Sequence, residues 1–277
     1  MSSIVTKEGI LHYETIGRGK PVILLHGWIN SWDVWRDCMF ALNRVGRYRV
    51  YALDFWGFGD SAKSNVDTFR LKSYVGMVYQ FMETLGIQAS PIFGHSMGGT
   101  VALKFALTHP ERIQKVAIVG SPIVGRSLNP FLKLAGQSWI AEIVWRYPII
   151  LHTIMRILLA NDSAQVRQMI FRDVQRTNME PFFRSIDDLR RTDLRKDLAN
   201  LHIPALGIYG TRDRIVSPKN AKLLLDGSEL AQVVMMDKSG HFPMTDQPEK
   251  FMEVLDAFLS NNDNSKKSPH GRVGTGS

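Results

Sequence analysis

Short apolar runs rich in β-branched residues recur along the chain and predict strands. These runs cover residues 10–14, 22–26, 49–53, 92–93, 116–119, 205–209 and 233–236. The first two flank the turn-forming sequence GRGK at residues 17–20 and are predicted to form an antiparallel hairpin. Most of the others are separated by stretches of helical periodicity, such as residues 71–85 and 100–109. The alternation predicts an α/β fold, with a mostly parallel sheet and helices on both of its faces.

The alternation of strands and helices stops after Pro122. The pattern then becomes amphipathic and helical, and it predicts helices over residues 131–146, 148–160, 163–176 and 181–191. Strand pattern returns at Ile203. We therefore expect an α/β core formed by residues 1–121 and 201–262, with an all-helical cap inserted at residues 122–200. The tail, residues 263–277, is polar and glycine-rich, and this composition predicts disorder.

A serine surrounded by glycines lies between one predicted strand and the helix that follows it. In GHSMGG, Ser96 has Gly94, Gly98 and Gly99 close by. Glycine inside an element costs roughly 0.5–1 kcal/mol relative to alanine, so three together indicate a backbone that side chains would obstruct. GHSMG matches the pattern G-x-S-x-G, in which a sharp strand-to-helix turn presents a nucleophilic serine. Ser96 is the candidate nucleophile; the alternative is a glycine-rich turn needed only for tight packing.

A serine hydroxyl needs a base, and the base needs a carboxylate that orients it. Of the eight histidines, His241 follows the run at 233–236, where a loop leaves the carboxyl edge of the sheet. Asp213 follows the run at 205–209 in the same way. Catalytic groups of open α/β sheets gather at this edge, and the order Ser, Asp, His is typical of them. Asp237 is the alternative carboxylate, but it is close to His241 along the chain.

The tetrahedral intermediate of acyl transfer needs two backbone N–H donors, and we expect them at Met97 and Trp28. Gly27 lets the loop that carries Trp28 approach the nucleophile, and His26 is expected to brace that loop. The candidate substrate-binding residues are Trp28, His95, Phe182 and Phe183. His95 is also expected to form a local hydrogen bond.

Five motifs in this order resemble those of the α/β-hydrolase superfamily. They are HGW at 26–28, LDFWGFGDS at 53–61, GHSMGG at 94–99, GTRDRIV at 210–216 and SGHFP at 239–243. The resemblance covers about residues 4–259 and implies a serine-nucleophile, esterase- or lipase-like member with a helical cap. It also implies that Ser96, Asp213 and His241 are the nucleophile, acid and base. Asp54 is expected to brace a tight turn.

The identity of the nucleophile narrows the range of reactions expected of the protein. Dehalogenases and epoxide hydrolases of the superfamily attack with an aspartate, and Ser96 at this position argues against both. We expect a hydrolase that cleaves a carboxylic ester through an acyl-enzyme, the substrate being a hydrophobic small molecule or a lipid-like ester. The alternatives are a carbon–carbon bond hydrolase, a cofactor-free haloperoxidase, and a low-turnover ligand receptor or signalling protein. No metal and no organic cofactor is implied.

Charge and cysteine content bear on the expected partners and location of the protein. The chain has 34 Lys+Arg and 26 Asp+Glu, a formal net charge of +8, which can attract nucleic acid or anionic lipid. No nucleic-acid-binding motif accompanies the charge, so no nucleic-acid partner is expected. We consider two roles for the arginines of the predicted cap: peripheral contact with an anionic membrane, or simple exposure to water. Cys38 is the only cysteine, and the N-terminus lacks the apolar core of a secretory signal; both favour a cytoplasmic location.

Overall fold

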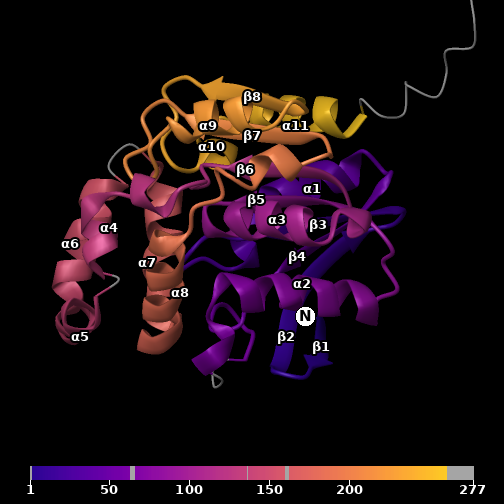
Figure 1. The fold of residues 1–277 in the computed structure, drawn as a ribbon. Coiled ribbons are helices and arrows are strands. Elements are labelled where there is room, and N and C mark those ends of the chain that lie inside the picture. Colours follow the sequence, from indigo (N-terminus) through magenta and orange to yellow (C-terminus); the bar gives the residue numbers. More distant parts are fainter. Residues whose placement is uncertain (1, 63–65, 136, 160–161, 261–277) are drawn as a thin grey trace, which may run out of the picture.

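An eight-stranded sheet runs through the centre of the computed structural model, which describes residues 2–62, 66–135, 137–159 and 162–260. The predicted disordered tail at 263–277 lies outside the described residues. The strand order is β1-β2-β4-β3-β5-β6-β7-β8 (Figure 1). The strands are β1 (Ser2–Thr6), β2 (Gly9–Gly17), β3 (Lys20–Leu25), β4 (Tyr48–Leu53), β5 (Ser90–His95), β6 (Ile113–Val119), β7 (Ala205–Gly210) and β8 (Ala231–Met236). All pairs from β4 to β8 are parallel, which confirms the predicted fold class.

The predicted hairpin between the first two apolar runs is wrong. β2 pairs antiparallel with β1 on one side and with β4 on the other, and β3 lies between β4 and β5. Leu24 and Leu25 of β3 are fully buried, as expected of a strand covered on both faces. The hairpin partner of β2 is β1, where Ile4 is partly buried and Val5 is 82% exposed. This edge strand has too few apolar residues to stand out in the sequence.

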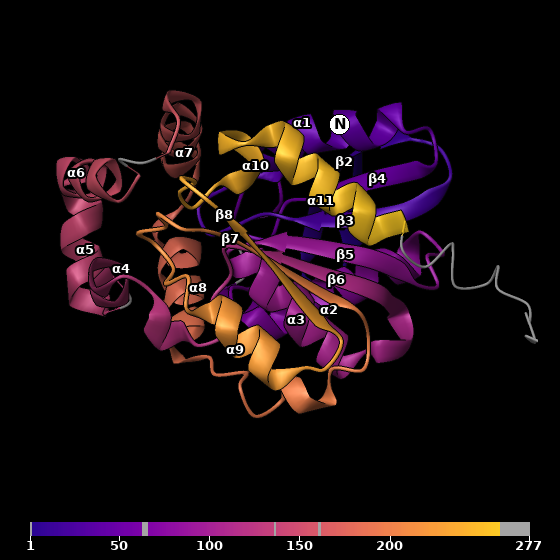
Figure 2. The ribbon, with the colours of Figure 1, turned by 90° about the horizontal axis from the view of Figure 1, so that it is seen from above.

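Helices cover both faces of the sheet. Figure 2 shows α1 and α11 on one face and α2, α3 and α9 on the other. These helices, with the short α10, are α1 (Arg36–Arg44), α2 (Leu71–Thr84), α3 (Met97–Thr108), α9 (Asn220–Gly227), α10 (Pro243–Asp246) and α11 (Pro248–Ser260). Every residue of β5 and β7 is buried. The loops that leave these central strands are therefore held by a well-packed core.

Five α-helices lie between β6 and β7 in the described part of the chain, where the sequence predicts only helical pattern. They are α4 (Pro130–Ala135), α5 (Ser138–Arg146), α6 (Pro148–Leu158), α7 (Ala164–Arg176) and α8 (Met179–Arg191). The helix predicted over residues 131–146 is divided into α4 and α5, because Gln137 has extended backbone angles. In both views, α4, α5 and α6 form the layer farthest from the sheet, and α7 and α8 lie between that layer and the core (Figures 1 and 2).

Candidate active site

Ser96 occupies the sharp turn between β5 and α3. Its φ of 52° and ψ of −119° are angles that residues other than glycine rarely adopt. The Ser96 N–H donates a hydrogen bond of 2.8 Å to the carbonyl of Val119, which fastens the turn to β6. Strained angles of this kind persist only where the surrounding structure enforces them. The turn is therefore a fixed part of the fold.

The glycines around Ser96 allow the backbone segments to pack closely. A Cβ on Gly94 would overlap the backbone of Gly98, and a Cβ on Gly98 would overlap the carbonyl oxygen of His26. A Cβ on Gly99 would overlap the hydroxyl of Ser121. The turn can form in this shape only without these side chains.

His241 and Asp213 are in direct contact. The Nδ1 of His241 lies 2.7 Å from the Oδ2 of Asp213. The other oxygen of Asp213 accepts hydrogen bonds from the N–H groups of Ile215 and Val216, at 2.8 and 2.9 Å. Because Nδ1 donates to the carboxylate, Nε2 of His241 is the nitrogen left to act as a base. Asp237 instead accepts a hydrogen bond from the side chain of Thr211.

The charge around His241 favours its protonated form. Burial lowers the pKa of the imidazole, but the charge and hydrogen bond of Asp213 raise it, and so do the charges of Asp162 and Asp246. The pKa of His241 therefore stands above its ordinary value of 6.5. A base with this bias takes up a proton readily and holds it as the imidazolium.

Asp162, in the connection between α6 and α7, is a site residue that the sequence analysis missed. Its Oδ1 accepts a hydrogen bond of 2.9 Å from the N–H of His241 and one of 3.2 Å from the N–H of Phe242. It is buried, and burial raises the pKa of this carboxyl to about 6. The connection between α6 and α7 thus contributes a carboxylate that holds the loop of the candidate base. No sequence motif marks it.

The two expected N–H donors lie on separate segments. Met97 is the first residue of α3, a position whose N–H has no acceptor within the helix. Trp28 follows β3 in a loop that His26 braces. The Nε2 of His26 accepts a hydrogen bond of 2.9 Å from the N–H of Phe55. The next residue, Ile29, has a φ of 63°, a rare conformation for a β-branched side chain.

A small cavity joins Ser96 to His241. Its volume is about 20 Å³, and both residues line it together with Trp28 and Asn30. The rest of the described lining is apolar: Ile29, Leu128, Leu132, Met155, Leu159, Ile170, Ile186, Leu189, Ile215 and Phe242. Asn30 is buried, and its Nδ2 has no hydrogen-bond partner among the described residues. No sequence motif marks Asn30, whose side chain adds a buried amide to this lining.

The candidate substrate-binding residues differ in their positions. Trp28 lines the cavity, and its indole N–H donates a hydrogen bond of 2.8 Å to the carbonyl of Phe182. The ring of Phe182 packs against the indole at 4.5 Å between centroids and does not itself line the cavity. His95 is fully buried, and its Nε2 donates to the carbonyl of His241 at 2.9 Å. Burial lowers the pKa of His95 well below its ordinary value, so this residue is a neutral local support.

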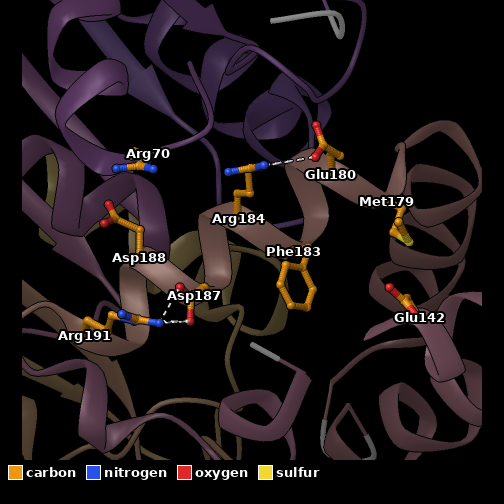
Figure 3. A pocket seen from close by; sticks show the side chains of 9 residues that line it. All are labelled: Arg70, Glu142, Met179, Glu180, Phe183, Arg184, Asp187, Asp188 and Arg191. Atoms are coloured by element: carbon orange, nitrogen blue, oxygen red, sulfur yellow. Dashed lines mark hydrogen bonds and ion pairs between the residues drawn. The ribbon is translucent and has the colours of Figure 1, made fainter. Parts of the chain in front are cut away.

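Phe183 lies in a different pocket, at the surface between α8, α5 and the start of α2 (Figure 3). This pocket has a volume of about 460 Å³. Two of the three arginines that line it pair with carboxylates on α8 itself: Arg184 with Glu180 at 3.2 Å, and Arg191 with Asp187 at 3.0 Å. Arg191, one of the cap arginines considered for contact with an anionic membrane, is therefore paired within the protein.

One cluster of possible metal ligands occurs in the part of the chain that the structure describes. Ligand atoms of His12, Asp54 and Asp60 lie within 4.8 Å of one another. The Oδ2 of Asp54 already contacts Nδ1 of His12 at 2.8 Å and accepts the N–H of Asp60 at 2.9 Å. Its Oδ1 accepts the N–H of Trp32. Asp54 thus ties the LDFWGFGDS turn to neighbouring segments.

Comparison with known proteins finds relatives over most of the chain. The chain is 28% identical over 259 residues to a pimeloyl-[acyl-carrier protein] methyl ester esterase of Aeromonas hydrophila, covering 89% of this chain and 98% of that protein. It is 24% identical over 266 residues to a 2-hydroxy-6-oxo-2,4-heptadienoate hydrolase of Pseudomonas putida, covering 90% and 92% of the two chains. A bromoperoxidase structure from Bacillus anthracis superposes with a TM-score of 0.82 at 25% identity, covering 94% and 100%. Esterase relatives confirm the prediction of a hydrolase that acts on ester bonds. Residues 20–248 match the family model of the alpha/beta hydrolase fold, and the chain belongs to this family.

Proposed function

We propose that Ser96, His241 and Asp213 form the catalytic triad of a carboxylic-ester hydrolase. The observation that carries the proposal is the 2.7 Å contact between His241 Nδ1 and Asp213, made at a cavity that Ser96 also lines. A serine on a strained strand-to-helix turn beside a carboxylate-bound histidine is the arrangement that activates an alcohol.

The reaction proceeds in two halves. Nε2 of His241 takes the hydroxyl proton of Ser96 as Oγ attacks the ester carbonyl, and the N–H groups of Met97 and Trp28 stabilise the oxyanion. The imidazolium, held by Asp213, then gives its proton to the departing alcohol. Water, deprotonated by the same histidine, attacks the acyl-enzyme and releases the acid and Ser96.

Residues 122–200 are proposed to act as a cap that shapes the substrate pocket. Leu132, Met155 and Leu189 of the inserted helices line the cavity beside Ser96. A volume of about 20 Å³ holds about one water molecule, so a substrate enters only when these helices move apart. The apolar wall favours an ester with a hydrophobic acyl chain, and the free amide of Asn30 favours a hydrogen-bond acceptor on that chain.

The test is labelling with a fluorophosphonate probe, followed by mapping of the modified residue and a panel of p-nitrophenyl esters. We expect modification at Ser96 in the wild type, none in Ser96→Ala, and hydrolysis that increases with acyl-chain length. Modification at another residue would contradict the triad. Tight ligand binding with negligible hydrolysis would favour a low-turnover receptor. Cleavage of a carbon–carbon bond without cleavage of any ester would favour a carbon–carbon bond hydrolase.

A further inference from the structure

Helices α4, α5 and α6 and the residues between them expose several large apolar side chains. We call this set the outer apolar surface, and it consists of Phe131, Leu134, Trp139, Ile143, Tyr147, Ile149 and Ile157. Trp139 is 61% exposed and Ile149 is 73% exposed. Single exposed apolar residues are ordinary, but a group of them on neighbouring helices marks a contact surface.

The spacing of these residues places them on one face of each helix. In α5, Trp139, Ile143 and Arg146 recur at i, i+4 and i+7, and all three are exposed. In α6, Ile149, Arg156 and Ile157 recur at i, i+7 and i+8 and are also exposed. Other apolar residues of α5 and α6 pack inward, so each helix has apolar side chains on both its inner and its outer face. The inward-packing residues include Ile140, Ile150, Ile154, Met155 and Leu158.

The position of these helices leaves the surface accessible. In Figures 1 and 2, α4, α5 and α6 form the layer of the molecule farthest from the sheet. No described helix is long and apolar enough to cross a bilayer.

The charge of the same layer is positive. Between Pro130 and Leu158 the sequence has three cations, Lys133, Arg146 and Arg156, and one carboxylate, Glu142. Glu142 lines the pocket toward α8 (Figure 3). Several arginines of α7 and α8 form ion pairs with carboxylates. Their pairs are Arg172 with Asp33, Arg184 with Glu180 and Arg191 with Asp187.

We propose that the outer apolar surface adsorbs to bilayers that contain anionic phospholipid. Tryptophan, tyrosine and isoleucine on exposed helix faces, with arginine and lysine beside them, are the composition of helices that lie in a membrane interface. The cations attract anionic headgroups, and the apolar side chains enter the boundary between headgroups and acyl chains. This inference goes beyond the proposed ester hydrolysis and does not depend on it, because adsorption needs no reactive serine.

The experiment is co-sedimentation of the full chain with vesicles, carried out in the Ser96→Ala background so that lipid turnover plays no part. We expect binding to phosphatidylcholine vesicles containing phosphatidylglycerol, and at least tenfold weaker binding to phosphatidylcholine alone. Trp139→Ser with Ile149→Ser should weaken binding to the mixed vesicles at least tenfold. Phe40→Ser with Ile10→Ser is the matched control, since these side chains are 53% and 52% exposed elsewhere on the molecule, and it should bind as the parent does.

Quenching by brominated lipid provides a second measurement that does not rely on a variant. Bromine in the acyl chains of the mixed vesicles should quench the tryptophan emission of the parent protein, and Trp139→Phe should remove most of that quenching. Equal binding by both double variants, or no binding to the mixed vesicles, would overturn the proposal. It would also be overturned by a concentration-dependent dimer that Trp139→Ser with Ile149→Ser abolishes, because a second copy would then cover the surface.

Discussion

The carboxylate of Asp162 accepts a hydrogen bond from the backbone N–H of His241, although 79 positions separate the two residues along the chain. Asp162 belongs to the inserted helical segment, and His241 belongs to the loop after β8. The same oxygen binds the N–H of Phe242, so the loop is held at two successive residues. The insertion therefore helps to set both the position and the protonation of the candidate base.

The charge of Asp162 should be visible in the pH dependence of the reaction. The pKa of His241 is raised, and the base must be neutral, so the acid limb of kcat/KM should lie above pH 6.5. Asp162→Asn keeps an acceptor oxygen but removes a negative charge that raises this pKa. The limb should therefore move to lower pH, as measured with a p-nitrophenyl ester from about pH 5 to 9.

Asp162→Ala distinguishes the effect of Asp162 on the position of the His241 loop from the effect of its charge on the pKa of His241. It removes the acceptor as well, so kcat should fall at every pH, whereas Asp162→Asn should retain most of kcat on the plateau. An acid limb that is unchanged in Asp162→Asn would show that this carboxylate does not influence His241.

Replacement of Asp213 by asparagine should nearly abolish turnover. The amide cannot stabilise the imidazolium or hold the proton on Nδ1, and the equivalent loss in a serine protease triad is about 10⁴-fold in kcat. Asp237→Asn is the matched control, because Asp237 lies in the same region but contacts Thr211 and Gln247. Its kcat should stay within about twofold of the wild type. Similar losses in both variants would contradict the assignment of Asp213.

Asn30 should show a conflict between stability and activity. A buried polar group without a partner costs about 1–3 kcal/mol, and Asn30→Leu keeps the branched shape while replacing the amide, with its unpartnered Nδ2, by methyl groups. The variant should melt at a higher temperature and should lose activity mainly on esters whose acyl chain carries a carbonyl. Paired measurements on simple alkyl and keto-acyl esters test this. Equal losses on both classes would exclude a role for Asn30 in substrate selection.

Two glycine-to-alanine changes should have opposite effects on the free energy of unfolding. Gly98→Ala places a methyl group against the carbonyls of His26 and Leu25, so it should destabilise the protein and reduce fluorophosphonate labelling. Gly76→Ala, inside α2, meets no atom within 4 Å and should stabilise the protein by about 1 kcal/mol. Denaturant unfolding of both variants provides the comparison. Equal tolerance of the two changes would show that the nucleophile turn can relax.

The sequence was most informative where the structural constraint is local. The turn at Ser96 could be predicted because its glycines are neighbours in the chain. Asp213 and His241 could be placed because each follows an apolar strand, and parallel strands end at one edge. The pairing of β2 could not be predicted, because the choice between β1 and β3 as its hairpin partner depends on burial across the whole sheet.

The lining of the cavity shows the same limit. Phe182 and Phe183 are adjacent in α8, but successive helical residues point about 100° apart, so one meets Trp28 and the other faces a surface pocket. Asp162 and Asn30 were missed because neither belongs to a recognisable motif. Their significance comes from groups that only the folded chain brings near them.

The small volume of the cavity beside Ser96 also affects how a measured dissociation constant should be interpreted. If the resting molecule has space for little more than a water molecule, the measured dissociation constant equals the intrinsic one divided by the fraction of molecules that are open. Substitutions that loosen the contact between Trp28 and Phe182 would then tighten ligand binding while lowering the melting temperature. Screening for inhibitors against the closed shape would overlook compounds that fit only the open one.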